Sequence, residues 1–429
     1  MCRYKDVGIP FPLGMVGGCK RKVVLTTQLI NVCGKMEVRK KIKVKCLNDD
    51  EAWSLFLEKV GEETISSHPL IPRLAKDVIK ELEGLPLALI TTGRAMYDKE
   101  DPREWQHAID LLKKSRLDEV EHSREDQEGS TFYRLKFSYD NLRSDTLREC
   151  FLSCSMWPED WLIKKEKFIE CWMGLGFIKE FDYISEAYNT GHTLIRYLIR
   201  ASLLEENEVY DEVRMHDVLR DMALWIAHDN GKNKNKWIVF RDEAPRDEEI
   251  WHKAERIMLI NSKIKEFPRI AATPSSSKLT TLMLSRNYNL TALGDNIGAL
   301  VALTYLDLSN CRIIHFPKEV CGLVQLRYLN LTNNEMPSLP VELGSFVNLK
   351  FLILRDTGIH TIPQGVIAKL KSLQLLDLYH NWRSIDENLT YLASQLLEEL
   401  ECLNNLKGLG ICIGDTSQHH LDYQSGGSA

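Results

Sequence analysis

The sequence contains no apolar run of the ~18 residues that a membrane-spanning helix requires. It begins MCRYKD, which is not the start of a secretory signal peptide. Its 11 cysteines include no Cys-x-x-Cys pair, and Cys150 and Cys154 are expected to be small buried residues rather than metal ligands. Together these features predict reduced thiols and a cytoplasmic protein.

The sequence also lacks an excess of basic residues, with 55 Lys and Arg against 61 Asp and Glu. The formal net charge is -6 over 429 residues, whereas nucleic-acid-binding proteins concentrate lysine and arginine against phosphate. We therefore expect no nucleic-acid partner. The length predicts two or three domains, and 44% hydrophobic and 27% charged residues are typical of globular chains.

A phosphate-binding loop of the form G-x-x-x-x-G-K-[ST] is missing from the sequence. Gly-Lys occurs only at Gly34-Lys35 and Gly231-Lys232, and neither pair is followed by serine or threonine. Phosphoryl transfer needs a metal, a lysine and a positioned nucleophile, and the sequence shows no such set. We therefore predict that the protein is not an enzyme.

The C-terminal half contains copies of the pattern L-x-x-L-x-L-x-x-N, the signature of leucine-rich repeats. Each copy adds one short strand to a curved sheet, and the leucines form a core only when copies stack. Irregular copies near residues 254–259 and 406–411 are expected to cap the ends. The regular copies begin at Leu279, Leu303, Leu326, Leu349 and Leu373. Their ninth positions, expected to bond to a neighbouring turn, hold Asn287, Cys311, Asn334, Thr357 and Asn381.

Two outward-facing positions of the predicted strands recur at the same phase and form ladders. These side chains either only coat the sheet or make a strip on the concave face that binds a protein partner. Their equal phase predicts that they align there. The first ladder is Tyr305, Tyr328, Phe351 and Leu375, and the second is Asp307, Asn330, Ile353 and Asp377.

The first half of the sequence reads as a short strand followed by helices. Residues 22–27, KVVLTT, suit a parallel strand buried on both faces, and ligands bind at the carboxyl end of such strands. Apolar residues spaced by three and four predict a helix over residues 71–82. Gly84 is expected to end this helix, and Pro86 to begin the next one.

An acidic, polar stretch at residues 118–129 is predicted to be a linker between two units. Helices are expected after it, over residues 135–157 and 168–177. Residues 203–204 and 213–215 are predicted to form the hairpin of a winged helix, with another helix directly after them.

Six short motifs in this half resemble, in the same order, the NB-ARC module of plant coiled-coil-type disease resistance proteins. The resemblance spans residues 5 to 415, because the repeats follow where that family has them. It implies a multidomain chain, with the remnant of an α/β nucleotide-binding domain at 1–33, a helical domain at 34–120, a winged-helix domain at 121–240 and an α/β leucine-rich-repeat solenoid at 245–429. The motifs are KVVLTT from residue 22, DEAWSLF from 50, GLPLAL from 84, LKFSYD from 135, CFL and WPED from 150 and 157, and MHD from 215.

The resemblance also implies a switch, in which ADP holds the receptor closed and exchange for ATP permits assembly of a signalling oligomer. Carried onto this sequence, the ring of Pro86 would pack on the adenine, and His216 would contact the β-phosphate of ADP. Thr26 and Thr27 would lie near the phosphates as a sensor. From the residues alone, Pro86 reads as an ordinary helix-start proline and His216 as a surface histidine.

The sequence departs from the family pattern around the phosphates. The loop and the acidic magnesium-binding strand are missing, and Gln28 stands where the family usually has arginine after the paired threonines. We expect an N-terminally truncated chain in which ADP or ATP binding is weak or absent. Its partner, a pathogen effector or a guarded host protein, would bind the concave face.

Two other functions remain open from the sequence. In the first, the chain would act through its repeats as a nucleotide-free decoy or regulator. In the second, its winged helix would bind nucleic acid. The net charge counts against the second, and so does the predicted helix over 218–226, where Arg220 is the one basic residue.

Overall fold

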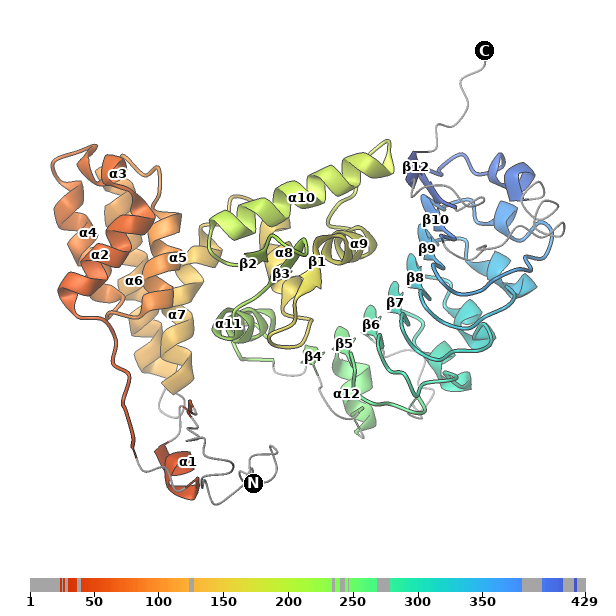
Figure 1. Cartoon of the computed structure of the whole chain (residues 1–429), viewed down its shortest axis with the longest axis horizontal. Helices are drawn as coiled ribbons and strands as arrows, with labels where there is room; N and C mark the ends of the chain where they lie inside the picture. The colour runs from red at the N-terminus through yellow and green to blue at the C-terminus, as the bar shows by residue number, and fades with distance from the viewer. Residues whose placement is uncertain are drawn as a thin grey trace, which may run out of the picture.

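The molecule consists of three parts in chain order (Figure 1): a bundle of helices, a unit with helices around three short strands, and a curved row of strands. The second part lies inside the curve of the third (Figure 1). The computed structural model describes residues 24, 26–27, 30–36, 40–122, 127–233, 236–239, 244–245, 247–267, 278–379, 396–411 and 420–422.

The first part is a bundle of helices that pack on one another. Ile71, Val78 and Leu82 are fully buried, so the helix expected over residues 71–82 is confirmed. Gly84 follows with a φ of +68°, and a Cβ there would lie 2.2 Å from the backbone oxygen of Leu47, so only glycine fits. The next helix begins at its predicted proline. The helices are α2 (Asp49–Val60), α3 (Glu62–Ser66), α4 (Ile71–Glu81), α5 (Pro86–Ala95), α6 (Pro102–His122) and α7 (Gln127–Asp140).

The stretch expected to be a linker, residues 118–129, is mostly helical. α6 runs to its end at His122, α7 begins at Gln127, and the two helices pack on each other. The prediction was wrong for the described residues 118–122 and 127–129, because glutamate makes a stretch polar and is also a good helix former. Because α7 also contacts α11 (Asp217–Ala227) of the second part, it joins the two units instead of separating them.

The parallel strand expected at residues 22–27 is absent where the structure describes this segment. Val24, Thr26 and Thr27 are exposed and lie outside any strand, while the rest of the segment and Gln28 fall outside the described residues. A strand buried on both faces needs neighbouring strands, and the described chain has none before β1. A short helix, α1 (Ile30–Lys35), follows.

The second part has the predicted hairpin and final helix of a winged helix. Its three-stranded antiparallel sheet has the order β1-β3-β2. Leu219 and Met222 are buried on the expected face of the final helix. The helix expected over 135–157 is interrupted, because Ser144 caps a new helix by accepting the N–H of Leu147 at 3.2 Å. The elements are α8 (Asp145–Cys154), β1 (Ile163–Lys164), α9 (Lys165–Leu175), α10 (Ile184–Arg200), β2 (Glu205–Asn207), β3 (Glu212–Arg214) and α11.

The third part is a nine-stranded sheet whose strands follow the chain order and are parallel except for the last. One strand falls in each predicted repeat, so the regular repeats and the irregular copies near residues 257 and 409 are confirmed. The strands are β4 (Trp237–Val239), β5 (Arg256–Met258), β6 (Thr281–Met283), β7 (Tyr305–Asp307), β8 (Tyr328–Asn330), β9 (Phe351–Ile353), β10 (Leu375–Asp377), β11 (Gly408–Gly410) and β12 (His420–Asp422), with helix α12 (Glu248–Lys253) after β4.

Side chains at the ninth repeat position tie successive turns together, as expected. Asn334 donates to the backbone oxygens of Leu308 at 3.0 Å and Leu331 at 2.8 Å, and accepts the N–H of Ile313 at 3.0 Å. Asn381, at the same phase, lies outside the described residues. The other side chains at this position that bond to backbone oxygens are Asn287, Cys311 and Thr357.

Candidate functional site

The repeats present an apolar column toward the second part of the molecule. Tyr305, Tyr328, Phe351 and Leu375 are Cα partners in successive strands, so their predicted alignment is confirmed. The rings of Tyr305 and Tyr328 stack, with centroids 4.3 Å apart and 2° between their planes. None of the four side chains is more than 3% exposed. The column is therefore a buried surface.

Helix α9 covers this column. A Cβ on Gly174 would lie 2.5 Å from Cδ2 of Tyr328 and 2.7 Å from Cε2 of Tyr305, so the helix approaches the rings closely at this glycine. The column belongs to the same apolar core as the helices, whereas the repeat leucines form a separate core. Figure 1 shows α9 and α10 inside the curve of the strands. The expectation of an open binding strip was wrong for this arrangement, because the chain buries its own large apolar surface.

A buried ion-pair network lies beside the column. Nη1 of Arg355 is 2.7 Å from Oε1 of Glu170 on α9, and Nε of Arg355 is 2.5 Å from Oδ2 of Asp377 on β10. The two carboxylate side chains are 2% and 0% exposed. The hydroxyl of Tyr188 on α10 donates to the same Oε1 at 3.3 Å. The network therefore joins both helices to the repeats.

The charges in this network stabilise one another. Burial alone would raise the pKa of Glu170, but the nearby charges of Arg355 and Lys167 outweigh it and hold that pKa below its ordinary value. Burial opposes the charged form of Arg355 as well, and the two carboxylates keep its pKa well above the ordinary value. Because a buried charge without a partner costs several kcal/mol, each member depends on the others.

The same interface extends along the repeats in both directions. At the β11 end, the N–H of Ile184 donates to the backbone oxygen of Lys407 at 3.2 Å. At the β6 end, the guanidinium of Arg286 lies over the ring of Trp161, 4.8 Å from its centroid. The guanidinium of Arg256 on β5 also lies 5.8 Å from the ring centroid of Phe177, so contacts between the second part and the repeats reach at least from β5 to β11.

The candidate phosphate ligand, His216, lies on the surface directly before α11. Its Nδ1 accepts the backbone N–H of Val218 at 3.2 Å, so the side chain caps the helix. In the neutral ring this leaves the proton on Nε2, which can donate to an anion at the positive end of the helix.

The other candidate nucleotide residues, Pro86, Thr26 and Thr27, are also exposed. Pro86 is the first residue of α5, and both α5 and α11 pack on α7, so one helix connects the two candidate contacts. With all four side chains exposed, the described residues do not enclose them in a nucleotide pocket. Their role in nucleotide binding stays a prediction.

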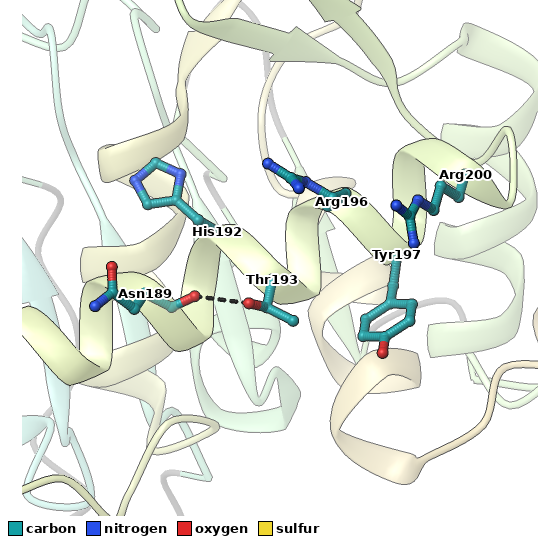
Figure 2. A pocket seen from close by; sticks show the side chains of 6 residues that line it. All are labelled: Asn189, His192, Thr193, Arg196, Tyr197 and Arg200. Carbon is teal, nitrogen blue, oxygen red and sulfur yellow. Dashed lines mark hydrogen bonds between the residues drawn. The ribbon is translucent and has the colours of Figure 1, made fainter.

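A shallow hollow of about 420 Å³ lies along the exposed face of α10. Because one helix supplies all of its lining and no buried charge faces it, it lacks the walls of a ligand site. Within the described chain, no helix has the length and apolar character to cross a membrane, and no group of three His, Cys, Asp or Glu is placed to hold a metal ion. Figure 2 shows the lining side chains, Asn189, His192, Thr193, Arg196, Tyr197 and Arg200.

Three residues of the interface, Glu170, Arg355 and Gly174, were not predicted from the sequence. Glu170 carried a signal, since it is the one charged residue in the apolar run FIECWM at 168–173, and a charge on a buried helix face needs a partner. Arg355 carried none, because its partner is 185 positions away in the chain.

Three domain families match this chain in the order that the fold shows. The NB-ARC domain matches residues 3–66, the winged-helix domain of disease resistance proteins matches residues 156–223, and the leucine-rich repeat region matches residues 264–424. The winged-helix match overlies the part that docks on the repeats.

Curated relatives of the chain are disease resistance proteins of Arabidopsis thaliana. Disease resistance protein RPS5 is 40% identical over 322 residues, 74% of this chain and 35% of that protein. Disease resistance protein RFL1 is 39% identical over 323 residues, which are 74% of this chain and 35% of that protein. A probable disease resistance protein is 38% identical over 416 residues, 96% of this chain and 47% of that one. The chain thus spans between about a third and a half of the length of these relatives.

Among solved structures, a leucine-rich-repeat protein of Leptospira interrogans matches 41% of each chain at 26% identity, with a TM-score of 0.32. The domain set and the curated relatives together support a plant NB-ARC–leucine-rich-repeat resistance protein.

Proposed function

We propose that this chain is part of a cytoplasmic plant immune receptor of the coiled-coil NB-ARC class, acting as a receptor and not as an enzyme. The observation that carries this function is the apolar column of the repeats, buried under α9 and bordered by the Glu170–Arg355–Asp377 network. The similarity to disease resistance proteins supports the same function.

In this function the docked arrangement is the resting state. While α9 stays in place, no partner has access to the column. Separation would expose four large side chains and leave Glu170 and Arg355 without each other. A pathogen effector or a guarded host protein favours separation only if it binds the separated state more tightly than the docked one.

Expression of the full gene in leaf tissue tests this function. The Gly174→Leu receptor should cause cell death without a pathogen, because leucine at this position cannot fit against Tyr328 and Tyr305. The matched control is Gly322→Ala, where a Cβ meets nothing within 4 Å. Equal protein levels are checked by immunoblot. A Gly174→Leu receptor that is separated but as silent as the wild type contradicts the function.

We also infer that the switch uses ADP and ATP, with His216 at the phosphates and Pro86 at the adenine. The support is the surface position of His216 at the positive end of α11, with Nε2–H left as a donor. Thr26 and Thr27 would complete the phosphate side. The alternative is a nucleotide-free repeat protein that acts as a decoy or regulator, favoured by the lack of a G-x-x-x-x-G-K-[ST] sequence in this chain.

Calorimetry on the purified chain separates these two. A phosphate-binding loop and its lysine supply about three charge-assisted bonds of ~2 kcal/mol each, so their lack weakens ADP binding by roughly four powers of ten. We therefore expect no ADP isotherm at micromolar protein and no ATP hydrolysis from these residues alone. A micromolar isotherm that is lost in His216→Ala, and kept in the surface control His107→Ala, would show instead that the remaining contacts suffice.

A further inference from the structure

Two aspartates occupy the same position in the repeat ladder, and only one has a counter-ion. Asp307 ends β7 and Asp377 ends β10, and their side chains accept the backbone N–H two residues on, at 2.9 Å from Ser309 and 3.1 Å from Tyr379. Both are buried, with 7% and 0% exposure. The second oxygen of Asp377 is paired with Arg355 at 2.5 Å.

Asp307 has no such partner among the described residues: no lysine, arginine or histidine forms an ion pair with it. Its Oδ1 accepts the N–H of Ser309, and the side chain borders an open space. That space is a cavity of about 370 Å³ between the second part of the molecule and the repeats. A buried carboxylate at this cavity is therefore available to a ligand.

The walls of the cavity are aromatic. Trp157 and Trp161 line it from the second part, and the stacked pair Tyr305 and Tyr328 lines it from the repeats. Arg286 already lies over the ring of Trp161, and Tyr305 and Tyr328 stack on each other, so these rings shape the cavity and Asp307 is the group that would bind a cation. Burying a carboxylate without a cation costs several kcal/mol. At the equivalent position of the ladder the fold avoids this cost, because Asp377 pairs with Arg355.

We propose that this cavity binds a small organic cation, whose ammonium or guanidinium pairs with Asp307 between the aromatic walls. The site goes beyond the receptor function, because binding would stand whether or not the chain signals. A volume of about 370 Å³ lies at the lower end of the range of small-molecule sites, which suits a ligand the size of an amino acid.

Basic side chains at the cavity restrict the ligand further. Lys164, Lys167 and Arg286 outnumber Glu212 and Asp307 in the lining, so these cationic side chains disfavour a polyamine or a divalent metal ion. They favour a ligand with an anionic group at its other end. The class of ligand is therefore a zwitterion with a basic side chain, and L-arginine is the probe.

Calorimetry and thermal unfolding of the whole chain test this site. L-arginine should bind one to one and raise the melting temperature, because it binds the folded state. L-citrulline has nearly the same shape but a neutral urea group in place of the guanidinium. It should bind at least about tenfold more weakly than L-arginine, since a charge-assisted bond is lost. A short peptide ending in arginine distinguishes a free amino acid from a protein terminus as the source.

Two aspartate variants make the test specific. Asp307→Asn should lose L-arginine binding at least about tenfold while its melting temperature stays equal or rises, because it removes an unpaired charge. Asp377→Asn should lower the melting temperature, because it removes a partner of Arg355. The surface variant Glu342→Gln should leave binding unchanged. The site would be overturned if Asp307→Asn kept its L-arginine binding or if L-citrulline bound as tightly as L-arginine. It would also be overturned if no binding were seen at millimolar L-arginine, or if Mg²⁺ alone gave a response that depends on Asp307.

Discussion

At the residue scale, Arg355 links the two sides of the interface. One guanidinium binds Glu170 from the docked unit and Asp377 from its own sheet, and both carboxylates are shielded from solvent, while the Arg355 side chain is 21% exposed. Such a network contributes more to the choice of one arrangement than to overall stability, because apolar residues of similar size would avoid the cost of burying charge.

We expect Arg355→Leu to lower the free energy of unfolding by about 3–5 kcal/mol, because it leaves two buried carboxylates without a cation. Urea unfolding followed by circular dichroism measures this. The control is Arg103→Ala, which removes a fully exposed ion pair with Asp101 and should change stability little. Equal effects of the two variants would mean that the buried network is not formed.

The depressed pKa of Glu170 predicts how stability depends on pH. The folded value lies below the ordinary value of 4.5, so ionised Glu170 contributes stability at higher pH, and this contribution is lost as pH falls from about 4.5 through the folded value. The melting temperature of Glu170→Gln should therefore fall less steeply than that of the wild type as pH is lowered through this window. Parallel melting curves from pH 6 to pH 3 would contradict the assignment.

At the element scale, each repeat depends on one polar side chain in its core. Asn334 makes three buried bonds to the backbone of two turns, which no apolar residue can replace. The periodic asparagine is therefore structural, whereas the column on the opposite side of the sheet serves the contact with α9.

We expect Asn334→Ala to destabilise the repeats by about 3 kcal/mol, because two backbone oxygens and one N–H lose their partners. Hydrogen exchange should show the loss in β7 to β9 first. Asn348→Ala, which removes a single bond of 2.9 Å to Val324 near the surface, is the matched control and should cost less than about 1 kcal/mol. A uniform rise in exchange over the whole chain in Asn334→Ala would argue against a local role.

At the scale of the whole molecule, the docked unit and the repeats share buried contacts. The column joins the apolar core of the helices, and the Glu170–Arg355 pair crosses the same boundary. The arrangement is therefore a property of the interface, and a change that affects only this interface should separate the parts without unfolding either.

Gly174→Leu should increase the radius of gyration in small-angle scattering and raise hydrogen exchange in α9 and in β7 and β8. The reason is steric, since the added carbons would overlap the rings of Tyr305 and Tyr328. Circular dichroism should stay that of the wild type, and Gly322→Ala should change neither quantity. An unchanged radius in Gly174→Leu would mean that α9 adjusts without undocking.

The repeats and several helices were predictable from the sequence because their signals are local. Leucine spacing marks each strand of the solenoid, and apolar residues at helical spacing mark α4 and α11. The phase of Tyr305, Tyr328, Phe351 and Leu375 was readable for the same reason. Local polarity misled at residues 118–129, where contacts between α6 and α7 favour helix.

The sequence by itself therefore determined which side chains align on the concave face and where helices with a regular apolar spacing, such as α4 and α11, form. Only the tertiary structure decided that α9 covers the column, that Glu170 pairs with Arg355, and that Asp377 has a counter-ion while Asp307 has none. Periodicity acts over a few residues, whereas the contacts of Glu170 with Arg355 and of Gly174 with Tyr305 join positions more than 100 apart in the chain, and no pattern in one segment specifies its distant partner.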